Sequence, residues 1–169
     1  MQGLMTNYFS ATHDKQSLLF YYAKSLITKN MTQAQQVFYR VKTDLMFFIR
    51  WEEAVLLPLF EDKNSPLFET YPTYSLLLEL QHSKILMEHI DQGFLQLIQP
   101  LQAPSNKAKL AINSKIDALL EIFDELEDLL LQLNIKKESI FFPTIDEALP
   151  KDDIAKLFLT MINFDTSCQ

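Results

Sequence analysis

One segment of this sequence occurs twice, and its two copies limit the fold more than any other feature. The first copy, W-E-E-A-V-L-L-P-L-F-E, covers residues 51–61, and the second, K-K-E-S-I-F-F-P-T-I-D, covers residues 136–146. A fainter repeat precedes each copy, with H-D-K at 13–15 and H-S-K at 82–84. The order of these segments predicts two related pairs of helices.

The two copies differ at one position that matters chemically. When they are aligned on Pro58 and Pro143, Glu52 of the first copy falls opposite Lys137 of the second. A carboxylate in one half of the chain therefore corresponds to an ammonium in the other half.

The composition indicates one all-α domain. The 169 residues are 48% hydrophobic, which is typical of a globular protein, and they include only two glycines, Gly3 and Gly93. Extended runs rich in Val, Ile and Thr, which would indicate strands, do not occur. We predict a single domain over residues 1–169 with its core at about 10–149.

Apolar periodicity and breakers place the helices of this domain. We expect an up-down-up-down four-helix bundle followed by a short C-terminal helix that caps it. The expected helices cover residues 10–28, 32–61, 73–98, 106–142 and 152–164.

Charge and cysteine content exclude several classes of protein. A net charge of -7 argues against binding nucleic acid, which needs Lys and Arg at the phosphates. The only cysteine, Cys168, can form neither a disulfide framework nor a thiolate metal site. The apolar runs are too short for a membrane span or a signal peptide, so we expect a cytoplasmic protein.

Two helices carry apolar series in which a single charge interrupts each series. Steps of three and four residues, as along these series, are typical of side chains that point into a bundle core. The first series is Phe38, Val41, Leu45, Phe48, Glu52, Val55 and Leu59, and the second is Ile112, Ile116, Leu119, Phe123, Leu126, Leu130, Leu133, Lys137 and Ile140. Since a charge is tolerated in a core only when it is paired, we predict that Glu52 and Lys137 lie within about 4 Å of each other.

We predict that the core-facing side of the third helix contains two histidines. That face is Leu78, His82, Leu86, His89 and Gly93. His89 is seven residues from His82, or roughly 10 Å along the axis, so the two cannot share an ion. We read His89 as a hydrogen-bonded core residue and Asp146, in the last helix turn of the second copy, as part of a solvated acidic face.

The histidines, the duplicated segment and their order together resemble the hemerythrin-like (HHE) cation-binding family. The resemblance spans His13 to Leu149 and rests on four segments. These are the histidine of the first helix, W-E-E-A-V-L-L-P-L-F-E, L-Q-H-S-K-I-L and E-S-I-F-F-P-T-I-D. The family implies one histidine from each helix, with bridging glutamates from the second and fourth helices that hold two irons. Carried over, the resemblance assigns His13, Glu52 and His82 as metal ligands.

Three positions depart from that ligand set. Phe48 and Leu133 stand where histidines are implied, and Lys137 stands where the second bridging glutamate is implied. Sliding the fourth helix by one residue would instead assign Asn134 to the lost histidine and Glu138 to the carboxylate. We prefer the alignment on the prolines because it also places Leu133 and Lys137 in the core series.

These departures favour a hemerythrin-like bundle that has lost its di-iron site and binds no cofactor. It would not be an enzyme, and its role would be structural or the binding of a protein partner, including a second copy of itself. The alternative is an iron-binding sensor or oxygen/redox protein with a reduced site, di-iron or mononuclear. That site would use His13, Glu52 and His82, completed by solvent or Glu138.

Overall fold

The computed structural model describes residues 3–98 and 106–164, which form helices and no strand. Cys168 lies outside these residues. The long helices are α1 (Leu4–Leu26), α2 (Met31–Trp51), α3 (Thr73–Ile98) and α4 (Asn106–Lys136), and two shorter ones follow, α5 (Phe142–Ala148) and α6 (Lys151–Ile162). None of the described helices is both long enough and apolar enough to cross a membrane.

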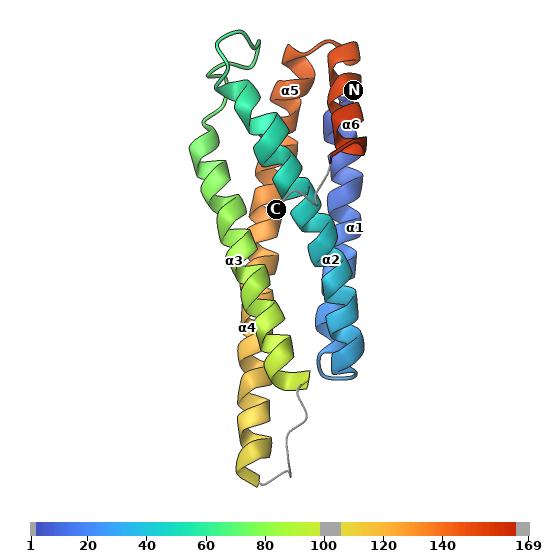
Figure 1. Ribbon diagram of the computed structural model, residues 1–169, viewed down its shortest axis with the longest axis vertical. Coiled ribbons are helices and arrows are strands. Elements are labelled where there is room, and N and C mark those ends of the chain that lie inside the picture. Colours follow the sequence, from blue (N-terminus) through green and yellow to red (C-terminus); the bar gives the residue numbers. More distant parts are fainter. Residues whose placement is uncertain (1–2, 99–105, 165–169) are drawn as a thin grey trace.

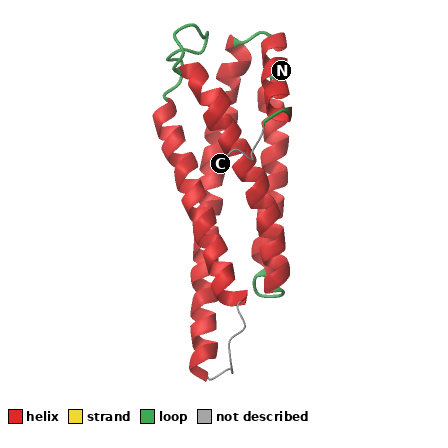
Figure 2. Cartoon of the chain, viewed as in Figure 1, coloured by secondary structure: helices red, strands yellow, loops and turns green. Residues whose placement is uncertain are grey.

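The four long helices run alternately up and down along one axis, and α6 turns back beside α1 (Figure 1). Connections lie at the ends of the helices (Figure 2). Trp51 at the end of α2 donates from Nε1 to Thr160 Oγ1 of α6 at 3.1 Å, and the ring of Tyr8 meets that of Phe158 at 5.1 Å. The predicted four-helix bundle followed by a C-terminal helix is confirmed, but that helix lies along the side of the bundle against α1 and α2 and does not cap an end.

Helix α1 begins at Leu4, six residues before the predicted start, because a distant carboxylate caps it. Asp146 of α5 accepts hydrogen bonds from the backbone N–H groups of Met5 and Thr6, at 2.8 and 3.0 Å, and from the Thr6 hydroxyl at 2.7 Å. These donors have no partner within a first helical turn, so an outside acceptor stabilises the turn. The interpretation of Asp146 as a solvated surface acid was therefore wrong.

Helices α2 and α4 each end in a π-helical turn, η1 (Glu52–Leu56) and η3 (Lys137–Phe141). The N–H of Leu57 bonds to the carbonyl of Glu52, and the N–H of Phe142 bonds to that of Lys137, five residues back in both cases. Each turn comes just before a proline, which cannot donate to the carbonyl four residues earlier, and the widened turn redirects the neighbouring bonds. The 3₁₀ turn η2 (Leu57–Phe60) follows the first, and α5 follows the second. The repeat in the sequence is thus also a repeat in the backbone.

The core contains most of the two predicted apolar series. Within the second series, Leu119, Phe123, Leu126 and Leu133 are buried, whereas Ile140, beyond Lys137, is 52% exposed. The π-turn adds a residue to its helical turn and so moves Ile140 away from the core-facing side of the helix. The prediction that this series points into the core therefore holds as far as the π-turn.

The predicted inner face of α3 was wrong. His82 and His89 are exposed and Leu78 is 47% exposed, so among these Leu86 alone is buried. The buried side of α3 is Leu76, Leu80, Ser83, Leu86, Met87, Ile90 and Phe94. Apolar residues occupy more than one side of this helix, so their periodicity does not fix which side faces the core.

Candidate functional site

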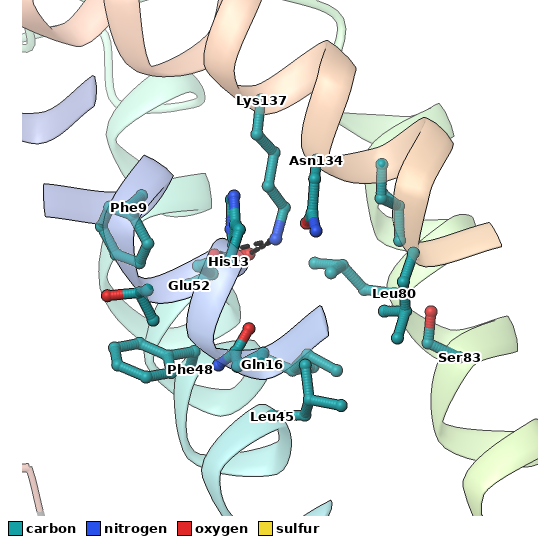
Figure 3. Close-up of a pocket in the computed structure, with 14 residues that line it drawn as sticks. Phe9, His13, Gln16, Leu45, Phe48, Glu52, Leu80, Ser83, Asn134 and Lys137 are labelled. Carbon is teal, nitrogen blue, oxygen red and sulfur yellow. Dashed lines mark hydrogen bonds and ion pairs between the residues drawn. The ribbon is translucent and has the colours of Figure 1, made fainter. Parts of the chain in front are cut away.

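The two π-turns bring their first residues together in the centre of the bundle. Glu52 is 1% exposed and Lys137 is 6% exposed. Lys137 Nζ donates to Glu52 Oε1 at 2.9 Å and lies 2.8 Å from Oε2 (Figure 3). The predicted contact between these two residues is confirmed.

The Glu52 carboxylate is only partly satisfied. Both of its oxygens contact the Lys137 ammonium, Oε1 through a hydrogen bond and Oε2 as an ion pair at 2.8 Å, and Oε2 has no hydrogen-bond partner among the described residues. Burial raises the pKa of Glu52 above its ordinary value, and the charge and hydrogen bond of Lys137 oppose that shift. The centre of the bundle therefore contains a close ion pair in which each carboxylate oxygen can still accept a further hydrogen bond.

His13 of α1 lies beside this pair and is also buried. Burial, followed by repulsion from Lys137, lowers the pKa of His13 to about 3, so the ring is neutral at pH 7. Its Nδ1 is 2.7 Å from Glu138 Oε1, a contact in which a neutral ring with its proton on Nδ1 is the donor. Burial, followed by the charge of Asp14, raises the pKa of Glu138, and a hydrogen bond from Ser10 opposes that shift.

Both registers considered for the fourth helix correspond to real contacts. Lys137 faces Glu52 in the core, as alignment on the prolines requires, and Leu133 is 1% exposed. Glu138 is the next residue and faces His13 on α1, with a side chain that is 32% exposed. The core position is therefore that of Lys137, and Glu138 occupies the edge of the site.

Phe48, at the position where the resemblance implies a histidine, belongs to an aromatic cluster. Its ring centroid lies 5.3 Å from that of Phe47, 5.6 Å from that of Phe9 and 6.5 Å from that of Tyr8. Edge-to-face contacts of this kind stabilise the packing of α1 against α2. Phe48 and Leu133 also line the cavity around the ion pair.

His82 does not reach the site. Its side chain is 49% exposed on the outside of α3, and Nε2 lies 3.4 Å from Glu125 Oε1 of α4. Its neighbour Ser83 is buried and lines the cavity instead. Of the three predicted ligands, the structure brings His13 and Glu52 together and leaves His82 outside.

The donor set does not fit a di-iron centre. No group of three or more His, Cys, Asp or Glu side chains that could hold a metal ion occurs within residues 3–98 and 106–164. An ammonium also lies against Glu52, the carboxylate that would have to bridge the ions. Two irons need several carboxylates and imidazoles at one level, and the described side chains do not provide them.

Three polar residues of this site, Thr12, Gln16 and Ser83, were not predicted from the sequence, and Asn134 was considered only in the shifted register. Gln16, Ser83 and Asn134 line the cavity with the ion pair (Figure 3), and Gln16 also donates from Nε2 to Asp44 Oδ2 at 3.0 Å. Gln16 lies one helical turn after His13 and Asn134 one turn before Lys137, so helical spacing could have indicated both.

Comparison with known proteins gave no further information about this site: no family model, curated protein or solved structure matches the chain.

Proposed function

We propose that this chain is a hemerythrin-like bundle that works without a metal, as a non-enzymatic scaffold for binding or assembly. The observation that supports it is the contact between Lys137 and Glu52 at the level where the resemblance implies two irons. The ammonium supplies the positive charge that a buried carboxylate needs, so no metal is required to neutralise it.

Electrostatic repulsion supports the same proposal. A divalent ion about 4 Å from the Lys137 ammonium would be repelled by on the order of 8 kcal/mol at an effective dielectric constant of about 20. Beside the pair, the described side chains that could ligate an ion are His13 and Glu138, and they already contact each other. Binding a metal here would require displacing Lys137 from the core.

One contact favours the alternative, an iron-binding sensor or oxygen/redox protein. The His13 imidazole and the Glu138 carboxylate are 2.7 Å apart at the edge of the cavity and could serve a mononuclear site together with solvent. His82 could take part in such a site only if α3 turned about its axis.

Partners and location also belong to this proposal. A net charge of -7 favours partners other than nucleic acid, and we propose a cytoplasmic location. A protein partner or a second copy could dock on the outer side of α6, where Leu159 is 57% exposed and Ile162 is 77% exposed.

Iron content after expression with added iron tests this function. We expect well under one iron per chain and no oxo-bridge charge-transfer bands in the near ultraviolet. The matched control is the triple variant Phe48→His, Leu133→His and Lys137→Glu, which removes the ammonium and adds donors around the same cavity. Two irons per parent chain, with those bands, would overturn the metal-free proposal and favour the redox alternative.

A further inference from the structure

The buried ion pair lies at the inner end of an opening between α1 and α4. An outer groove of about 140 Å³ adjoins an inner chamber of about 20 Å³ that Glu52 and Lys137 line. The two spaces share four lining residues: Gln16, Leu45, Leu130 and Asn134. The groove and the chamber are therefore neighbours, and these shared side chains lie where a ligand would pass from one to the other.

The outer groove has the size and the apolar wall to hold a narrow aliphatic chain. Phe20, Leu45, Leu130 and Leu131 form much of its wall, and Ser17 and Glu127 contribute polar groups. Leu131 is 59% exposed, so part of this apolar wall is open to solvent. A ligand that covered the groove would gain the free energy of removing this surface from water.

The inner chamber suits one small polar group. Its volume of about 20 Å³ is enough for a single group the size of a water molecule or a hydroxyl. Lys137 has three N–H groups and Glu52 Oε2 has two acceptor sites, so the 2.8 Å contact between them leaves capacity on both. A hydroxyl can accept from the first and donate to the second at the same time.

Charge selects against ionised head groups in that chamber. The ion pair has no net charge, and Glu127 in the groove wall is paired with Lys24. Asp44 and Glu138, however, contact the lining residues Gln16 and His13 and add negative charge nearby, which disfavours an anion. A cation would meet the Lys137 ammonium at the inner end and be repelled. A neutral head group avoids both costs.

We infer that this opening binds a neutral aliphatic molecule that ends in a hydroxyl, with its chain in the groove and its oxygen beside the ion pair, within hydrogen-bond reach of both Lys137 Nζ and Glu52 Oε2. This deepens the proposed function, since it requires the ion pair, and not a metal, at the centre. It gives the scaffold a small-molecule ligand of defined chemistry.

Binding of three matched probes tests the inference. Hexan-1-ol, hexanoate and hexylammonium share one chain and differ in the charge of the head group. We expect hexan-1-ol to bind and the two ions to bind at least about ten-fold more weakly, the factor given by losing about one hydrogen bond. Titration can be followed by calorimetry and by the fluorescence of the single tryptophan, Trp51, whose ring stacks 5.9 Å from that of Phe9 in the chamber wall. No binding of the alcohol, or tighter binding of either ion, would overturn the inference.

A matched pair of variants locates the bound probe. Ser17→Phe places a ring in the groove, whereas Ser114→Phe places one on an exposed site of α4, 17 residues before Leu131 and so roughly 25 Å away along the helix. Only Ser17→Phe should weaken hexan-1-ol binding, by about ten-fold or more. Equal binding by both variants would place the alcohol elsewhere and contradict the inference.

Removing the ion pair tests the role of the head group. The double variant Glu52→Leu, Lys137→Met should bind hexan-1-ol about ten-fold more weakly, because both hydrogen-bond partners of the hydroxyl are removed. Binding as tight as in the parent would contradict recognition by the pair. Metal analysis of the same parent sample separates the two proposals: a metal-free protein that ignores hexan-1-ol refutes the ligand alone, and a di-iron protein refutes the proposed function.

Discussion

Lys137→Met is the most direct perturbation of the buried pair, because methionine keeps much of the aliphatic stem and removes the ammonium. The change leaves Glu52, 1% exposed, without a cation in the core. The carboxyl group must then either stay charged at a high desolvation cost or take up a proton. Proton uptake costs less free energy, and this cost depends on pH.

The size of the effect follows from the ordinary pKa of the carboxyl group. Each pH unit above 4.5 adds about 1.36 kcal/mol to the cost of keeping Glu52 protonated in the folded protein. If the intact pair contributes little net free energy, the variant loses about 3.4 kcal/mol at pH 7 and about 0.7 kcal/mol at pH 5. In the variant, the folded-state pKa of Glu52 is raised above its unfolded-state pKa. The resulting loss in the free energy of unfolding therefore grows as the pH rises above the unfolded-state pKa.

Urea unfolding of parent and variant at pH 7 and pH 5 measures both values. Lys24→Met is the control, since Lys24 pairs with Asp124 at the surface and should contribute at most about 1 kcal/mol at either pH. The double variant Glu52→Leu, Lys137→Met should be close to the parent or more stable. A single variant as stable as the parent at pH 7, or a loss that does not shrink at pH 5, would refute this reasoning.

Two further changes test other parts of the core. The pKa of His13 is lowered from 6.5 to about 3, so the parent should lose up to about 3.4 kcal/mol between pH 7 and pH 4 in urea unfolding, about 1.36 kcal/mol for each pH unit below 6.5, while His13→Phe should lose less. A variant with the full acid sensitivity of the parent would show that His13 is not its source. Asp146→Asn should lower the free energy of unfolding by about 1–2 kcal/mol, whereas the exposed Glu147→Gln should change it by less than about 0.5 kcal/mol, and equal values would contradict the capping role.

The sequence was sufficient to predict the central contact because each partner interrupted an otherwise apolar series. Glu52 and Lys137 could be matched without a structure, since both precede a proline by six residues and occupy the same register. The capping of α1 by Asp146 could not be predicted in this way. It joins residues 141 and 140 positions apart, and a single acidic residue near a chain turn gives no sign of such a partner.

The buried side of α3 was predicted wrongly because the two copies of the repeat differ in which residue faces the neighbouring helix. Glu138 and Glu53 are equivalent residues of the two copies, and each contacts the first helix of the other helix pair, α1 and α3 respectively. Glu138 meets His13, the first residue of H-D-K, but Glu53 meets Lys84, the last residue of H-S-K, at 2.6 Å. Two residues correspond to about 200° around a helix, so α3 presents Lys84 where α1 presents its histidine, and His82 turns outward.

The repeat also explains why a charge reversal is stable at the centre. Because Glu52 and Lys137 are equivalent positions that contact each other, they lie where the two halves of the bundle meet. A repeat with identical residues would place two carboxylates face to face in the core, and such a pair needs a bound cation or a shared proton. Lysine in one copy supplies the positive charge from within the chain. The same substitution keeps the pair free of net charge, and this is the property on which the proposed recognition of a neutral hydroxyl rests.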